Sequence, residues 1–356
     1  MQLEIEGDSL QAGGVDPSAL RVFTLERLTL GKSALRFAFV STIAGFCNAK
    51  NVTPEWEGDH MVNGNLEESN RNNADLEVEF PVVDISNWER LGTESVGTNK
   101  PVWYLNSITG KKWVYKTEGR KTNTFYGKAW AEKIVCEVGL LLGVACANTQ
   151  LATAKDSYGS ISESFLLQGW EEKAGDLLIS EIRPSFKKMG KPHTHHNLSE
   201  ITRVLSQVAA PPNSPKELKS AFDAFTGFLV LDALTASCDR HVENWAVVIG
   251  PDQQSRLAPS WDHGNSLGFN LTSEGMRNIL NSGIQEWASK GKAAKFEGVR
   301  KAQLTKHALA ASALCEISVQ EFWENQVQNL DLVKVERIIE RVPHMSQTSS
   351  VNSYWH

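Results

Sequence analysis

The segment CDRHVEN, residues 238–244, gathers several polar side chains directly before an apolar run that is typical of a β-strand. Asp239 and Asn244 lie on the loop that enters this strand, and Asp262 follows a second short strand. Because antiparallel pairing brings the start of one strand beside the end of the next, Asp262 should return to Asn244. Carboxylate and amide oxygens are the hard ligands that Mg²⁺ prefers. We therefore predict that Asn244 and Asp262 hold Mg²⁺, with Asp239 placed to accept a proton from an incoming hydroxyl.

This set of groups is typical of phosphoryl transfer, which needs a metal, a cation on the nucleotide and an acceptor for the proton of the nucleophile. Lys116 ends the apolar segment WVYK and is the predicted cation. A carboxylate on the following helix should hold it. Glu137 lies four positions after Lys133 and could simply pair with that lysine. Glu132 shares its helix face with small and apolar residues, so we prefer Glu132.

Two further segments are predicted to contact the nucleotide. Gly97 lies in a loop before the strand-like segment PVWYL, where backbone N–H groups could contact phosphates, and Lys100 would add positive charge. The segment Leu167–Gly169 lies between a predicted strand and the helical half of the chain. From that position alone, we predict Leu167 and Gly169 as the hinge that contacts adenine.

Taken together, these motifs resemble those of the HipA-like kinases in the protein-kinase-like superfamily. That family carries an Asp-x-His-x-x-Asn loop followed by an Ala-Pro-x-x-Asp motif. The matching residues here are Asp239, His241 and Asn244, then Ala258, Pro259 and Asp262. The resemblance extends from about Phe80 to the C-terminus.

The resemblance implies an α+β, two-lobed fold with a small β-rich lobe and a larger helical lobe, which bind ATP and Mg²⁺ between them. It implies Asp239 as the catalytic base, Asn244 and Asp262 as magnesium ligands, and Lys116 as the contact to the nucleotide phosphates. A serine or threonine of another protein is the implied acceptor. Relatives can be switched off by autophosphorylation of a loop serine, for which Ser95 is the candidate.

Three questions about function stay open. The best-known HipA-like kinases dock a DNA-binding antitoxin through an additional N-terminal β-rich domain, which residues 1–79 do not resemble; such an antitoxin is nevertheless an expected partner. The DRH segment with a later D-x-G is also similar to phosphoinositide kinases, so a lipid or small-molecule substrate is an alternative. A catalytically inactive regulatory protein with this fold is the other alternative.

Several nearby polar residues have plainer interpretations. We expect His241 to fix the loop by hydrogen bonding to backbone near Asp262. Arg240 fits a substrate contact or a surface charge equally well. The histidines of the segment HTHHN, at 193, 195 and 196, lack a partner carboxylate or cysteine and are expected to lie in a solvated loop.

The elements that must position these residues are visible in the sequence. The turn NSITGKK separates two strand-like segments and predicts a hairpin that ends at Lys116. Apolar residues at helical spacing predict a helix over Gly127–Leu142, stopped by Gly143. The segment Ile161–Leu167 predicts a further strand. These elements make up a predicted small lobe over residues 80–169.

The second half, residues 170–356, is predicted to be the helical lobe. Ser214–Glu217 fits a capping box with proline at the first helical position. The segments WAVVIG and RLAPSWD flank the turn PDQQS and predict the hairpin that brings the polar residues together. A long helix is predicted over Ser318–Arg341.

Composition limits the classes of function. The chain has 356 residues with 41% apolar residues and a net charge of −6, so we expect a folded core and no direct binding of nucleic acid or anionic membrane. The five cysteines are scattered, which predicts neither disulfides nor zinc and favours a cytoplasmic location. The apolar segment Phe37–Cys47 is too short to cross a bilayer. Residues 1–79 are predicted to be an extension or linker.

Overall fold

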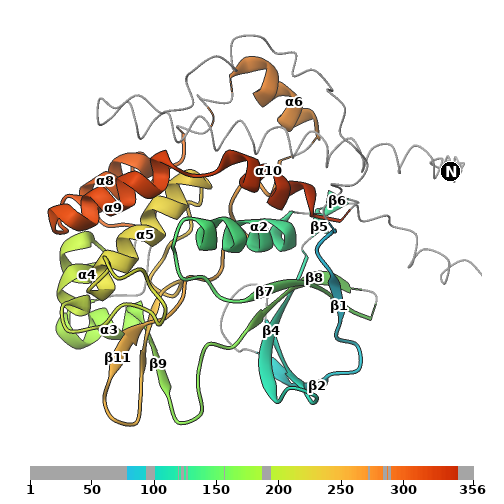
Figure 1. Ribbon diagram of the computed structural model, residues 1–356, viewed down its shortest axis with the longest axis horizontal. Helices are drawn as coiled ribbons and strands as arrows, with labels where there is room; N and C mark the ends of the chain where they lie inside the picture. Colours follow the sequence, from blue (N-terminus) through green and yellow to red (C-terminus); the bar gives the residue numbers. More distant parts are fainter. Residues whose placement is uncertain are drawn as a thin grey trace, which may run out of the picture.

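The structure is a computed structural model that describes residues 78–343, except 94–100, 119, 122–123, 126, 156, 187–193, 272, 284–286 and 288–289. The described chain has a sheet-rich part, formed mainly by residues 80–163, and a mainly helical part that follows it (Figure 1). Among these described residues, no helix combines the length and apolar character needed to cross a bilayer.

The first part is built on a six-stranded sheet with the strand order β1-β7-β8-β4-β3-β2. All of its neighbouring pairs are antiparallel except β1 with β7. The strands are β1 (Val82–Asp84), β2 (Glu89–Thr93), β3 (Val102–Asn106), β4 (Lys111–Thr117), β7 (Thr149–Ala154) and β8 (Ser157–Glu163). The predicted hairpin is thus confirmed as β3 and β4. Two short strands, β5 (Arg120–Lys121) and β6 (Thr124–Phe125), form a separate ribbon.

Helix α2 (Lys128–Leu141) packs against β7 and β8, so the helix predicted over Gly127–Leu142 is confirmed to within one residue at each end. Its N-cap, Gly127, has no side chain that could satisfy the first backbone N–H groups. Glu118 supplies this cap from the end of β4, because its carboxylate accepts from the N–H groups of Lys128 at 3.0 Å and Ala129 at 2.7 Å.

The second part combines helices with a three-stranded sheet of order β11-β10-β9. Its strands are β9 (Glu171–Ala174), β10 (Ala246–Ile249) and β11 (Ser255–Leu257), and β10 and β11 form the second predicted hairpin. Its helices are α3 (Gly175–Ile182), α4 (Leu198–Leu205), α5 (Ala221–Leu234), α6 (Ser273–Ser282), α8 (Leu304–Ser312), α9 (Ile317–Gln328) and α10 (Leu332–Glu340).

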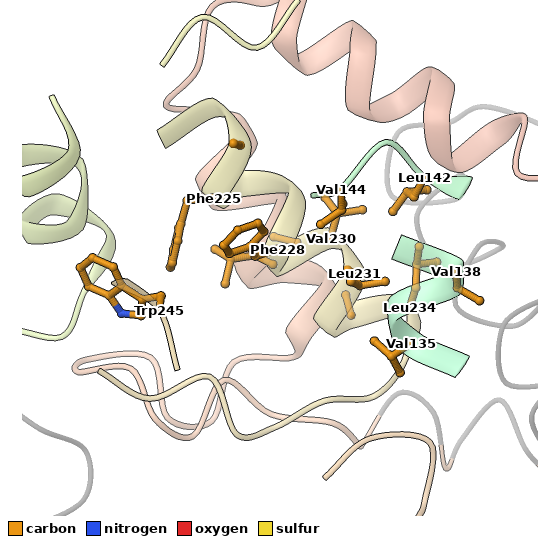
Figure 2. Close-up of a cluster of buried hydrophobic side chains, with 14 of the residues drawn as sticks. Val135, Val138, Leu142, Val144, Phe225, Phe228, Val230, Leu231, Leu234 and Trp245 are labelled. Carbon is orange, nitrogen blue, oxygen red and sulfur yellow. The ribbon is translucent and has the colours of Figure 1, made fainter. Parts of the chain in front are cut away.

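Helix α5 is the centre of the core, and all its residues except Asp223 are buried. Figure 2 shows Leu231 and Leu234 of α5 turned toward Val135 and Val138 of α2. Helix α10 also returns to pack on α2, as Figure 1 shows. One hydrophobic cluster therefore spans both parts of the chain.

Three predicted elements differ from the structure. The strand predicted over Ile161–Leu167 corresponds to β8, which begins at Ser157, four residues before the predicted start, and ends at Glu163. The capping box is not Ser214–Glu217 but Ser220 with Asp223, since only the second precedes an uninterrupted apolar run. The predicted helix Ser318–Arg341 is divided into α9 and α10, and Asp331 caps α10 by accepting from Val333 and Lys334.

Candidate active site

The site is built around an ion pair between the two parts of the chain. The Lys116 ammonium, near the end of β4, lies 2.5 Å from Asp262 Oδ1, although the residues are 146 positions apart. Both side chains are partly accessible, at 26% and 35% exposure. Burial disfavours the charged Asp262 carboxylate, but the Lys116 ammonium outweighs this and holds the pKa of Asp262 below its usual value. The pair places a cation and an ionised oxygen ligand side by side, both partly exposed to solvent.

Glu132 lies beside this pair on α2. Its side chain is buried, and a Cβ placed on Gly264 would be 3.5 Å from Glu132 Oε2. Burial raises the pKa of Glu132, although the nearby Lys116 charge acts in the opposite direction. Glu132 Oε1 is buried without a hydrogen-bond partner. Of the two carboxylates considered from the sequence, Glu132 is therefore the one within electrostatic reach of Lys116.

Glu137 is engaged elsewhere. Its Oε1 lies 2.5 Å from the Lys133 ammonium, which also donates to the Thr149 carbonyl at 2.8 Å. Lys133 is buried and lies over the Phe80 ring at 4.7 Å. This pair is the helix interaction considered from the sequence, although Lys133 is far less solvated than a surface lysine.

Asp239 is held by two residues that the sequence motifs did not indicate. Asp239 Oδ2 accepts from the Asn265 amide at 2.6 Å, and Oδ1 lies 2.5 Å from the Lys295 ammonium. The Asp239 side chain is 23% exposed, so it remains accessible to solvent. Lys295 belongs to an irregular segment with no motif around it, and no sequence signal could have placed it here.

Asn244 is buried at the entrance to β10, and its amide nitrogen donates to the Asp239 carbonyl at 2.9 Å. This bond fixes the orientation of the side chain relative to the loop. In the hairpin, the Ala258 N–H donates to the Ala246 carbonyl at 3.0 Å. The ladder does not continue to Ser260, because the Ser260 N–H donates to the Ala145 carbonyl and its carbonyl accepts from Ala147. Antiparallel pairing of β10 with β11 brings the two predicted metal ligands to the same end of the hairpin.

Arg240 and His241 serve the loop itself. Arg240 is buried and forms two hydrogen bonds to the Asp232 carboxylate, at 2.9 and 2.7 Å, and a third to the Asn244 carbonyl. It is therefore not a surface charge. Burial lowers the pKa of His241, and its Nδ1 accepts from the Glu243 N–H at 3.2 Å rather than from backbone near Asp262.

The turn Asp262–Gly264 has an unusual backbone. Asp262 has a φ of 63°, in the left-handed region that few residues other than glycine adopt. The next residue, His263, is 1% exposed. Burial lowers its pKa to about 3, so the ring is neutral. The turn thus has a partly exposed Asp262 followed by a buried side chain.

The predicted hinge residues Leu167 and Gly169 lie in the segment that joins β8 to β9, and so connect the two sheets. The Leu167 side chain is 64% exposed, and Gly169 has a φ of 79° that favours glycine. Gly97, Lys100 and Ser95 lie outside the described residues, as do His193 and the segment Phe37–Cys47.

His196 was expected in a solvated loop, and this expectation is wrong. The ring is fully buried, stacks on Phe296 with centroids 4.4 Å apart, and is hydrogen-bonded through Nδ1 to the Lys295 carbonyl at 2.9 Å. The Trp245 indole N–H donates to the other ring nitrogen at 3.3 Å. His196 therefore anchors the backbone of the lysine that contacts Asp239.

No protein-family model and no curated protein matches the chain. Among solved structures, the Helicobacter pylori proinflammatory kinase CtkA matches with a TM-score of 0.50 and 16% identity, over 73% of this chain and 99% of that chain. HipA of Shewanella oneidensis MR-1, solved with HipB and its operator DNA, matches with a TM-score of 0.35 and 12% identity, over 73% of this chain and 67% of that chain. The first likeness shows that this chain shares the fold of that kinase, and the α+β fold class predicted from the motifs, with a sheet-rich part and a helical part, is confirmed.

Proposed function

We propose that this protein is an ATP- and Mg²⁺-dependent phosphotransferase that modifies serine or threonine on another protein. The observation that carries the proposal is the ion pair between Lys116 and Asp262, which joins the predicted phosphate contact to the predicted metal ligand across the two lobes. The kinase fold supports the same conclusion. Asp239 and Asn244, which are linked to each other, supply the remaining groups that phosphoryl transfer requires.

The donor set fits magnesium. Asp262 offers an ionised carboxylate and Asn244 an amide, which are hard oxygen ligands. Bound between these residues and ATP, Mg²⁺ would neutralise phosphate charge as the transferred group leaves. The side chains themselves would orient the nucleotide from the C-terminal lobe.

Lys116 and Glu132 would act from the other lobe. The Lys116 ammonium pairs with Asp262, while Glu132 Oε1 is buried without a hydrogen-bond partner. We propose that Lys116 moves from Asp262 toward the nucleotide phosphates during binding, with Glu132 holding its ammonium. That exchange would free Asp262 for the metal and satisfy the buried oxygen of Glu132.

Asp239 would accept the proton of the acceptor hydroxyl. The Asn265 amide fixes one of its oxygens, which orients the carboxylate. The Lys295 ammonium beside the other oxygen could contact the transferring phosphoryl group, since it lies within 2.5 Å of the proposed base.

The test is incubation of the purified protein and a lysate with radiolabelled ATP, with and without Mg²⁺. Asp239→Asn should lower incorporation about 10²–10⁴-fold, because it removes the base while keeping the shape of the side chain. Asp262→Ala should abolish binding of Mg-ATP in a calorimetric titration. The matched control is Asp252→Asn, in the exposed turn between β10 and β11, which should behave as the wild type.

Incorporation that is equal in wild type and Asp239→Asn would contradict the proposed base. Label that enters extracted lipids rather than proteins would favour the lipid-kinase alternative. A protein that binds Mg-ATP but transfers no phosphate under any condition would favour the inactive regulatory alternative. An antitoxin or other DNA-binding protein is the partner we propose to seek by affinity purification.

A further inference from the structure

A second cluster of chemically reactive side chains lies behind the Asp262 turn. Cys136 on α2, Cys146 before β7, and His263 come together, and their sulfur and nitrogen atoms all lie within 4.8 Å of one another. The three residues are far apart in the sequence, which is why spacing of the cysteines predicted no metal site. Only the fold brings them to one place.

Two members of the cluster are buried, and the ring nitrogens of His263 lack hydrogen-bond partners, whereas the Cys136 thiol donates to Thr149 Oγ1 at 3.5 Å. Cys136 is 2% exposed and His263 is 1% exposed, and neither ring nitrogen of His263 forms a hydrogen bond. The Ser260 carbonyl lies near the ring and also accepts from the Ala147 N–H at 2.9 Å. A buried imidazole without a partner costs free energy unless another group meets its nitrogen. The position of this ring therefore indicates a ligand on the side of the two sulfurs.

The backbone brings the second sulfur close to α2. A Cβ placed on Gly139 would lie only 2.5 Å from Cys146 Sγ, so any other residue at this helical position would displace the sulfur. Cys146 is in turn held by a backbone bridge to Ser260, three residues before His263. These contacts hold together the three elements that carry the cluster, namely helix α2, the segment before β7 and the Asp262 turn.

We propose that Cys136, Cys146 and His263 bind one Zn²⁺ ion. On binding, the two thiols release their protons to solvent and bind as thiolates, and the neutral imidazole binds through one nitrogen. The two negative charges cancel those of the ion, which suits a buried position. Two zinc–sulfur bonds of about 2.3 Å at a tetrahedral angle set the sulfurs about 3.8 Å apart, and the ligand atoms here lie within 4.8 Å of one another. A water molecule would complete the tetrahedral set.

The proposed zinc site differs from the proposed magnesium site in chemistry and in place. Thiolate and imidazole ligands favour zinc and similar ions over magnesium, whereas the oxygens of Asn244 and Asp262 favour magnesium. His263 and Asp262 are adjacent, but His263 lies beside the two thiols, whereas Asp262 pairs with Lys116. A bound zinc ion would hold this turn to α2, and with it Asp262 to Glu132. The zinc proposal does not depend on kinase activity.

The experiment measures metal content of the full-length protein, purified without chelators, by inductively coupled plasma mass spectrometry. We expect about one zinc ion per chain, in keeping with a single three-residue site. Cys136→Ser and Cys146→Ser should each lower the content at least about ten-fold. Cys315→Ser is the matched control, because this partly buried thiol bonds to Thr226 and Ala311 instead, and it should keep its zinc.

Titration of the metal-free protein with Co²⁺ gives a second measurement. Thiolate-to-cobalt charge-transfer absorption should appear in the wild type and in Cys315→Ser, and zinc but not magnesium should displace it and raise the melting temperature. If a serine variant does not fold, Co²⁺ titration of the chelator-treated wild type still shows whether the protein binds metal through thiolates. No metal and no cobalt absorption would overturn the proposal, as would a mass showing a disulfide between Cys136 and Cys146.

Discussion

Two carboxylates, those of Asp262 and Glu132, are close enough to interact with the Lys116 ammonium. They differ in how well water can solvate their charge when Lys116 is not beside them. Asp262 is partly solvated and can remain charged beside Lys116 or beside a metal ion. Glu132 is 2% exposed, so water cannot replace a missing partner. The raised pKa of Glu132, caused first by burial, reflects this deficit. We therefore expect Glu132 to gain more than Asp262 when nucleotide binding moves the Lys116 ammonium toward it.

This asymmetry gives a prediction for the two candidate carboxylates. Glu132→Gln should lower phosphoryl transfer by about 10²-fold, because the Lys116 ammonium would be poorly positioned. Its melting temperature should not fall, because the change removes the cost of burying a charge. Glu137→Gln is the matched control and should keep its activity, since Glu137 pairs with Lys133. Steady-state kinetics and thermal unfolding measure both effects, and equal activity loss in the two variants would contradict the choice of Glu132.

At the scale of single residues, motifs reveal only part of the site. Asp239, Asn244, Asp262 and Lys116 are candidates because they occur in recognisable patterns next to strand-like segments, and their roles stay predictions. Lys295 and Asn265 could not be predicted, because their contacts to Asp239 depend on how irregular segments fold back. The buried ring of His196 was missed for the same reason, since polar neighbours in sequence say nothing about tertiary burial.

At the scale of helices and strands, prediction succeeded where apolar residues recur at regular spacing and a residue such as glycine marks the end of the element. Helix α2 has apolar residues at helical spacing and a glycine after its end, so both of its ends could be predicted. Strand β9 could not be predicted, since EEKA lacks apolar alternation and is a strand only because it pairs with β10. Local pattern therefore located the hairpin that carries the site, but not the full sheet around it.

The contact between β4 and β8 determines where Lys116 lies. A Cβ placed on Gly159 of β8 would be 2.1 Å from the Lys116 carbonyl oxygen, so glycine is required for the two backbones to approach. Gly159→Ala should push β4 aside, destabilise the protein by about 1–3 kcal/mol and weaken ATP binding. Ser160→Ala, at the next position of β8, is the control and should bind ATP normally. Urea unfolding measures the stability of the two variants, and calorimetric titration measures their ATP affinity. Equal values for Gly159→Ala and Ser160→Ala would contradict the prediction.

For the whole molecule, the continuity of the core has consequences for how the chain folds. Figure 2 shows side chains of α2 meeting those of α5, although these helices belong to different predicted lobes. The Phe80 N–H also donates to the Arg341 carbonyl at 2.7 Å, which ties the start of the sheet to the end of α10. The proposed lobe boundary near residue 169 therefore does not separate two independent cores.

We predict that a fragment of residues 80–169 does not fold by itself. It would expose Val135, Val138 and Leu142, each of which contributes about 1.5–3 kcal/mol when buried. The total stability of a domain is only about 5–15 kcal/mol, so this loss is decisive. Circular dichroism during heating should show no cooperative transition for the fragment and a clear one for the full chain. A cooperative transition in the fragment would contradict a shared core.

Buried neutral histidines should make the stability of the whole protein depend on pH. His307 on α8 is 4% exposed, its Nε2 has no hydrogen-bond partner, and burial lowers its pKa to about 4. In the unfolded chain the ring has a pKa of about 6.5, so below that pH the unfolded state binds a proton that the native state does not. Stability should therefore fall as the pH drops from about 6.5 toward 4, with His307 contributing about 2 kcal/mol of the loss at pH 5.

His307→Phe should reduce this dependence, because phenylalanine keeps the packing against Phe296 and cannot bind a proton. Urea unfolding of both proteins at pH 7 and pH 5 measures the effect. The wild type should lose about 2 kcal/mol more than the variant between these values. Identical losses in the two proteins would mean that His307 is protonated, and therefore solvated, in the native state.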